Sequence, residues 1–228
     1  MGDLAATMRH LEELRSLGFN IFNVKAGDDP DGDIKRLRAL AENVRPNEIL
    51  IVDANGAWRV DTAVYVMASL ADCPKLYFEQ PCASYADCLA VRRRLQSRII
   101  LDESVKDVAA VLKAREDGVA DAITMKINNV GGLSKARLVR DLCAELALPL
   151  IIQDSWGSQI TDATIAHLGH STPPSVLLAG WCSIGHCGLE TVENPSPIVA
   201  GQLSANEGPG LGIRPRWSVI GKPLQTFE

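Results

Sequence analysis

The sequence predicts an α/β protein built as a TIM-type (β/α) barrel of parallel strands, incomplete at about seven strand–helix units. Short, mainly apolar runs alternate with amphipathic helical stretches, as in a parallel sheet covered by helices. Charged residues close five of these runs at intervals of about 25 residues, the length of one strand–helix unit. No GxGxxG or GxxxxGK[ST] turn follows a strand, which disfavours the open nucleotide-binding sheets.

The helices are predicted from apolar residues at helical spacing. The first carries its apolar stripe at Leu4, Met8, Leu11 and Leu14, and Gly18 ends it. The later helices repeat this pattern, so helices are expected over residues 4–17, 33–44, 61–70, 85–95, 105–115, 133–146 and 160–168.

A short apolar run follows each helix and predicts a strand. These runs lie at residues 22–25, 49–53, 76–79, 99–102, 122–126, 150–152 and 176–179. Few polar residues interrupt them, which favours strands that are covered on both faces. A complete barrel needs one strand more, and because the chain begins on a helix we expect that strand upstream.

The barrel domain is predicted over residues 1–187. Residues 188–228 are rich in Gly and Pro and have weak periodicity. We therefore expect this C-terminal segment to pack on the barrel instead of adding another strand–helix unit.

Composition excludes several classes of function. The chain has 228 residues, is 46% hydrophobic and carries a net charge of −5. Acids and bases are mixed along it without a basic stripe, so a nucleic-acid partner is not expected. No apolar run is long enough for a membrane span, and the N-terminus lacks the pattern of a secretory leader. A cytoplasmic protein with no membrane partner is expected.

The charged residues that close the strands are Lys25, Asp53, Glu79, Asp102 and Lys126. The C-terminal ends of barrel strands form one face, so these side chains should converge there. Three carboxylates in one place repel one another, and a hard divalent cation relieves that repulsion. Oxygen-only ligands suit Mg²⁺ and also Mn²⁺, and no His or Cys stands at an equivalent position.

The two lysines flank the three acids in chain order. A lysine near a dication and another lysine should have a lowered pKa and act as a base near neutral pH. The chemistry indicated is removal of a proton from the carbon next to a carboxylate, with the metal stabilising the enediolate. Bases on two sides permit epimerisation, and a neighbouring hydroxyl can leave as water. Taken singly, each acid could instead cap a helix and each lysine could be a solvated surface residue.

With these residues in place, the chain resembles the barrel domain of the enolase superfamily, in the branch of muconate lactonizing enzyme and mandelate racemase. The matching segments are residues 23–25 (NVK), 53–55 (DAN), 78–81 (FEQP), 102–104 (DES) and 126–132 (KINNVGG). The resemblance implies Mg²⁺ on Asp53, Glu79 and Asp102, and Lys25 and Lys126 as the acid/base pair. The family's Lys-x-Lys motif appears here as Asn23-x-Lys25, so one auxiliary cation is missing.

Within that branch, residues 25–31, 153–157 and 210–216 are most similar to members that act on proline derivatives, the cis-3-hydroxy-L-proline dehydratases and the betaine epimerases. This implies a small-molecule carboxylate substrate. Asp154, Trp156 and Trp181 are then expected to receive a cationic ring nitrogen, with Asn55 as a further substrate contact. Each Trp could instead pack at the barrel rim.

The leading hypothesis is therefore a Mg²⁺-dependent dehydratase of cis-3-hydroxy-L-proline. The alternatives are a racemase or epimerase of a proline-type or other carboxylate, and an inert truncated barrel that acts as an interaction partner. Family members carry an N-terminal capping domain, which this chain is expected to lack, and an open barrel edge favours a homo-oligomer. His167 and His170 are expected to be surface or packing residues, and His186 is expected near the active rim.

Overall fold

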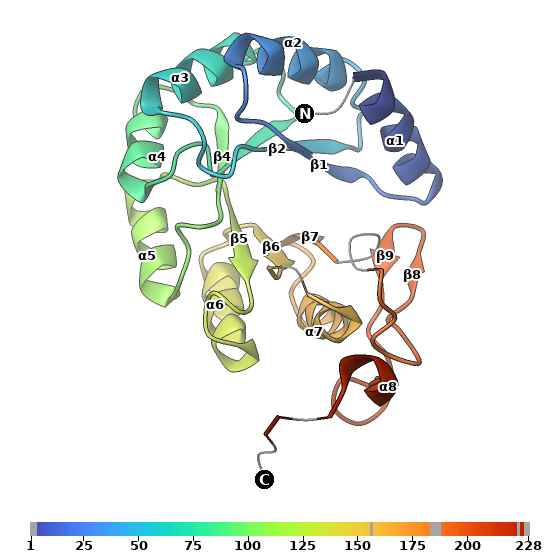
Figure 1. Ribbon diagram of the computed structural model, residues 1–228. Coiled ribbons are helices and arrows are strands. Elements are labelled where there is room, and N and C mark those ends of the chain that lie inside the picture. Colours follow the sequence, from blue (N-terminus) through green and yellow to red (C-terminus); the bar gives the residue numbers. More distant parts are fainter. Residues whose placement is uncertain (1–3, 156, 183–187, 223, 226–228) are drawn as a thin grey trace.

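Seven parallel strands form one curved sheet, and helices run along its outer side (Figure 1). The computed structural model describes residues 4–155, 157–182, 188–222 and 224–225. The strands are β1 (Ile21–Lys25), β2 (Ile49–Asp53), β3 (Leu76–Glu79), β4 (Arg98–Leu101), β5 (Ala122–Lys126), β6 (Leu150–Gln153) and β7 (Leu177–Gly180). The helices that alternate with them are α1 (Leu4–Ser16), α2 (Pro30–Ala41), α3 (Val60–Ser69), α4 (Tyr85–Arg92), α5 (Val108–Asp117), α6 (Leu133–Glu145) and α7 (Gln159–His170).

The strands pair in chain order from β1 to β7, always in parallel. Within the described part of the chain, no ladder joins β7 back to β1. The fold is thus an incomplete (β/α) barrel, which confirms the predicted fold class. No described helix is both long and apolar enough to cross a membrane.

Two helices begin three residues away from the start that the apolar pattern predicts. The helix expected from residue 33 starts at Pro30, because the Asp29 side chain accepts the Gly32 N–H at 2.8 Å and proline suits the first helical turn. The helix expected from residue 105 starts at Val108, because Asp107 accepts the Ala110 N–H at 2.8 Å. Cap residues, more than apolar spacing, therefore fix these helix starts.

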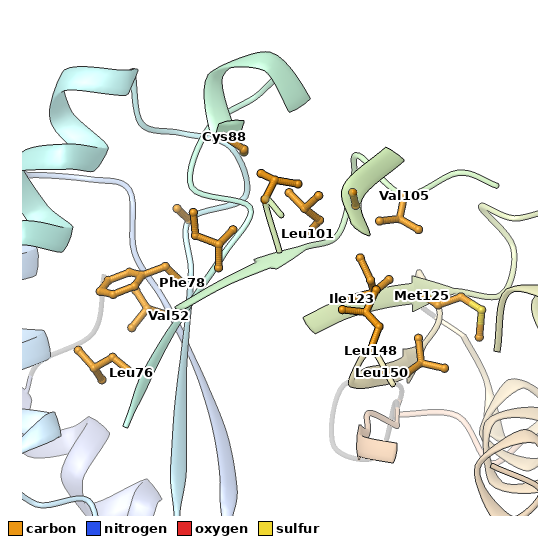
Figure 2. Close-up of a cluster of buried hydrophobic side chains, with 14 of the residues drawn as sticks. Val52, Leu76, Phe78, Cys88, Leu101, Val105, Ile123, Met125, Leu148 and Leu150 are labelled. Carbon is orange, nitrogen blue, oxygen red and sulfur yellow. The ribbon is translucent and has the colours of Figure 1, made fainter. Parts of the chain in front are cut away.

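Alternation along each strand divides the side chains between two layers. One set points outward and packs against the helices, and Figure 2 shows members of this outer core, including Val52, Phe78, Leu101, Ile123 and Met125. The alternate set points to the inner side of the curved sheet, where the buried members are Ile51, Ile100, Ala122 and Ile151. Because successive strand residues face opposite sides, Asp53, two residues after Ile51, also faces inward.

The C-terminal segment contains a two-stranded hairpin of β8 (Ile198–Val199) and β9 (Gln202–Leu203) and the short helix α8 (Trp217–Ile220). The backbone of Gly201 lies so close to Gly18, between α1 and β1, that a Cβ on Gly201 would stand 2.3 Å from the Gly18 carbonyl oxygen. The segment also touches α7, where the His167 ring bonds the Leu211 carbonyl oxygen at 3.1 Å. The predicted boundary at residue 187 stays a prediction, because residues 183–187 lie outside the described residues.

Candidate active site

The charged residues that close the strands stand side by side at one end of the sheet. In the ladders, Lys25 is level with Asp53, and Asp53 is level with Glu79. Asp102 directly follows β4, and Lys126 is the last residue of β5. The order across the sheet is therefore lysine, three acids, lysine. The inner-face alternation turns these side chains toward the open mouth of the barrel.

Glu79 lies at the centre of this row and is almost fully buried. Its Oε2 accepts a hydrogen bond from Asn23 Nδ2 at 3.0 Å, and its Oε1 accepts one from the Thr124 hydroxyl. Burial, followed by the negative charge of Asp53, raises the pKa of Glu79 well above its ordinary value, and the Thr124 hydrogen bond only partly opposes this. Without a further cation, the centre of the site therefore disfavours the ionised form of Glu79.

Lys25 binds the acid on its own side of the row. Its Nζ lies 2.6 Å from Asp53 Oδ2 and 2.7 Å from Asn55 Oδ1. The Lys25 side chain is 59% exposed, whereas that of Asp53 is 6% exposed. This amine is therefore open to the mouth while its carboxylate partner is held in the sheet.

Lys126 forms the equivalent pair with Asp102 on the other side. Here both partners are sheltered, with side-chain exposures of 16% and 2%. Burial raises the pKa of Asp102 to about 6, although Lys126 acts in the opposite direction. The second oxygen of Asp102, Oδ1, is buried and has no hydrogen-bond partner. One acceptor at the mouth is therefore left unsatisfied.

The lowering of the lysine pKa was expected beside a bound dication and stays a prediction for Lys126. Burial does lower its pKa, but the hydrogen bond and charge of Asp102 outweigh burial, so the pKa is raised above its ordinary value. The expectation assumed a dication as the dominant neighbour, whereas the nearest charge in this structure is a carboxylate.

Two residues that the sequence analysis did not assign a role hold the central acid in place. Asn23, noted there only as a departure from the family motif, and Thr124 each lie two residues before a lysine on the same strand. Period-two alternation was the signal that could have found them, because it places them on the inner face below Lys25 and Lys126. Residue 23, where the auxiliary cation was expected to be missing, thus carries an amide that donates to Glu79.

Asn55, expected as a substrate contact, has protein partners in this structure. Its Oδ1 accepts from Lys25, and its Nδ2 donates to Glu103 Oε1 at 3.2 Å. Its main-chain N–H also donates to Asp53 Oδ1 at 2.9 Å. Asn55 therefore links the end of β1 to the loops after β2 and β4, and its contact with substrate stays a prediction.

Two of the other predicted substrate residues, Asp154 and Trp181, directly follow β6 and β7. Asp154 follows β6, and its Oδ1 accepts the N–H of Asn128, just past β5, at 3.3 Å. Trp181 follows β7, and its main-chain N–H donates to the Ile152 carbonyl oxygen at 2.9 Å. Trp156 and His186 fall outside the described residues. The structure thus brings Asp154 to the end of β5 that carries Lys126, and the substrate roles stay predictions.

The acids at the mouth have the chemistry of a magnesium site. Asp53, Glu79 and Asp102 offer carboxylate oxygens, the ligands that Mg²⁺ prefers, and the free Oδ1 of Asp102 lacks a partner that a cation could supply. Among the described residues, no three Asp, Glu, His or Cys side chains are grouped closely enough to hold an ion, and the lysines hold the outer two carboxylates. The residues fit a cation by type and by their places on adjacent strands.

Comparison with known proteins assigns the fold to a family. The family model described as "Enolase C-terminal domain-like" matches residues 6–219. A cis-3-hydroxy-L-proline dehydratase from Roseibium aggregatum is 32% identical over 220 residues, which is 96% of this chain and 60% of that protein.

Solved structures agree with this assignment. A mandelate racemase/muconate lactonizing enzyme from Roseovarius nubinhibens ISM superposes with a TM-score of 0.92 at 35% identity, over 97% of this chain and 60% of that one. A second structure from the same organism, described as a putative mandelate racemase/muconate lactonizing enzyme complexed with magnesium, has a TM-score of 0.93 at 29% identity and covers 100% and 64%. The chain thus spans about 60% of the length of these relatives. On its fold, its residues and these matches, the chain belongs to the enolase superfamily.

Proposed function

We propose that this chain provides the proton-transfer face of a Mg²⁺-dependent hydro-lyase that dehydrates cis-3-hydroxy-L-proline. The observation that carries the proposal is the pair of lysines on either side of a buried acid row, Lys25 on Asp53 and Lys126 on Asp102. The 32% identity to a protein named for this reaction supports the choice of substrate. Because the chain spans about 60% of that relative, the activity is proposed for a protein that contains this chain.

The hydrogen on the carbon next to a carboxylate is only weakly acidic, so its removal needs a base and a means to hold the negative charge that develops. Asp53, Glu79 and Asp102 would hold Mg²⁺ (or Mn²⁺), which when bound stabilises negative charge on the substrate carboxylate. Asn23 and Thr124 keep the central acid fixed, since both donate to Glu79.

The two lysines divide the proton transfers. One of them takes the α-proton, and the electron pair of that C–H bond forms a carbon–carbon double bond as the C3–O bond breaks. The departing hydroxide receives a proton from one of the two ammonium groups and leaves as water, giving a pyrroline carboxylate. Asp154, Trp156 and Trp181 are proposed to receive the cationic ring nitrogen.

Epimerisation or racemisation of a proline-type or other carboxylate is the second candidate. The same observation favours it, because amines on two sides of one acid row can remove a proton from one face and return it to the other. The two reactions share every residue named so far and differ in whether the C3 hydroxyl leaves.

The protein should therefore be incubated with cis-3-hydroxy-L-proline and Mg²⁺ in D₂O and the products identified by NMR. Formation of a pyrroline carboxylate supports dehydration. Deuterium at the α-carbon with the hydroxyl retained supports epimerisation instead. Recovery of unlabelled, unchanged substrate contradicts both reactions on this substrate.

A catalytically inert barrel is the candidate from another class, and metal binding separates it from an enzyme. Calorimetric titration with Mg²⁺ should give stoichiometric binding that is lost in Asp53→Ala. As a control, Asp72→Ala removes an exposed acid that pairs with Arg38 of α2, and it should bind Mg²⁺ like the wild type. Absence of binding by the wild-type protein favours the inert barrel.

A further inference from the structure

Gln80 directly follows the central acid Glu79 and has an unusual backbone. Its φ is +36°, in the left-handed region that residues with a Cβ rarely adopt. The chain therefore turns sharply as soon as β3 ends. A glycine would make this turn with less strain, so a glutamine here indicates that its side chain is needed.

The side chain of Gln80 is buried and its hydrogen-bonding capacity is filled. Its Nε2 donates to the Cys82 carbonyl oxygen at 2.9 Å and to the Ser104 hydroxyl at 2.8 Å. Its Oε1 accepts the main-chain N–H of Asp102 at 3.1 Å and that of Ser104 at 3.3 Å. One carboxamide therefore holds the chain on both sides of the third acid.

Gln80 acts from the outer side of the sheet. Phe78 belongs to the outer core and Glu79 to the inner row, and the Gln80 amide lies 3.7 Å from the sulfur of Cys88 on α4. Its side chain is directed toward the helix layer and away from the mouth. It can influence chemistry at the mouth only through the main chain that it binds.

The main chain of Gln80 extends the same connection to the neighbouring loops. Its N–H donates to the Ile100 carbonyl oxygen at 2.9 Å, and its carbonyl oxygen accepts the Gly56 N–H at 2.7 Å. Gly56 lies in the loop after β2, and Ile100 lies in β4. Gln80 thus ties together the three strand ends that carry Asp53, Glu79 and Asp102.

We propose that Gln80 is a positioning residue that sets the place of the Asp102 carboxylate, and with it the spacing of the three acids. The inference rests on the proposed function, because it takes those acids to hold Mg²⁺. When a residue that holds a metal ligand in place is removed, the affinity for the metal commonly falls by about 10- to 100-fold. The same order of loss is expected here without any change in the ligands themselves.

Two variants separate the side chain from the backbone strain. Gln80→Leu keeps the volume and removes the side-chain hydrogen bonds. Gln80→Gly removes the same bonds but relieves the left-handed strain, so it should fold more readily. The matched control is Arg140→Met, which removes a buried polar side chain of α6 that bonds the main chain of Ser171, at the opposite end of the strands.

For each protein, the Mg²⁺ dissociation constant is measured by calorimetry and the melting temperature is measured in EDTA. Both Gln80 variants should bind Mg²⁺ at least about tenfold more weakly, whereas Arg140→Met should lower the melting temperature and leave affinity within about twofold. If Gln80→Gly binds Mg²⁺ with wild-type affinity, the inference is overturned, whatever affinity Gln80→Leu has. The proposed metal site is not contradicted by that result. A wild-type protein that binds no Mg²⁺ contradicts the proposed function and this inference together.

Discussion

The two lysines at the mouth differ in how far they are sheltered from water. The Lys126 side chain is 16% exposed beside its buried partner Asp102, whereas the Lys25 side chain is 59% exposed beside its buried partner Asp53. Because the Lys25 amine is open to water, its charge is screened by solvent and its pair contributes less to stability. Removing the more sheltered Lys126 amine leaves the Asp102 charge uncompensated in a site with little water and is more costly.

We therefore expect Lys126→Met to lower the free energy of unfolding by about 3 kcal/mol and Lys25→Met to lower it by less than about 1 kcal/mol. Urea denaturation of the two variants in EDTA measures this difference, and each variant serves as the control for the other. Both should lose the proposed activity, since each removes one acid/base group. Equal losses of stability would mean that burial does not distinguish the two pairs.

The sequence predicted the acid row and its lysines because each closes a strand, where position alone decides the direction of the side chain. The same rule, applied two residues earlier, leads to Asn23 and Thr124. Gln80 was beyond this reasoning. Its role depends on a left-handed turn that no pattern in the sequence indicates. Its partners in the loop after β4 are brought close to it only by folding.

At the scale of elements, a buried ion pair joins α1 to the loop before β2. Arg15 donates to both carboxylate oxygens of Glu48, at 2.7 and 2.6 Å, and the Arg45 N–H donates to Glu48 at 2.8 Å. The hydrogen bond from Arg15 is the main reason that the pKa of Glu48 lies below its ordinary value of 4.5. The partners are distant in sequence, so no local pattern could have predicted the pair.

This lowered pKa has a definite consequence for stability against pH. In the folded protein Glu48 stays ionised to lower pH than in the unfolded chain, so the unfolded chain takes up the proton first. The stabilisation is present in full above about pH 4.5 and is lost as pH falls through the folded pKa. In urea denaturation, the stability difference between wild type and Glu48→Gln should be about 2 kcal/mol at pH 7 and should shrink below pH 4.5. A difference that stays constant with pH would contradict the assignment.

The contact between the β8–β9 hairpin and the turn before β1 gives a second test at this scale. Gly201 has φ +73° and its α-carbon faces the Gly18 backbone, whereas Gly210 has φ +64° and open space around it. Gly210→Ala should therefore cost only the left-handed penalty of about 1 kcal/mol. Gly201→Ala should cost about 3 kcal/mol, because the hairpin must also move. Thermal unfolding compares them, and equal costs would show that the hairpin does not pack there in solution.

Over the whole molecule, the order and type of the strands and helices followed from the sequence, because each parallel strand is a nearly continuous apolar run. Helix starts were less accurate, since the caps at Asp29 and Asp107 outweigh apolar spacing. The register of the ladders could not be predicted in detail. It depends on how every strand packs against its neighbours, yet it is what brings Lys25, Asp53 and Glu79 level.

The open sides of the sheet lead to a prediction for the molecule as a whole, the expected homo-oligomer. In the described part of the chain, β1 and β7 each pair with one strand only, and an unpaired edge favours association. Ile49 N–H donates to Asn20 O and Ala26 N–H donates to Asp53 O, so the even-numbered residues of β1 face β2. The N–H of Ile21 therefore faces away from β2.

In sedimentation velocity, the protein should form species heavier than the 24.6 kDa chain as its concentration rises. Ile21→Pro removes an edge donor without removing a bond to β2, so it should weaken this association. A single 24.6 kDa species at every concentration, or equal association of both proteins, would argue against pairing through the β1 edge.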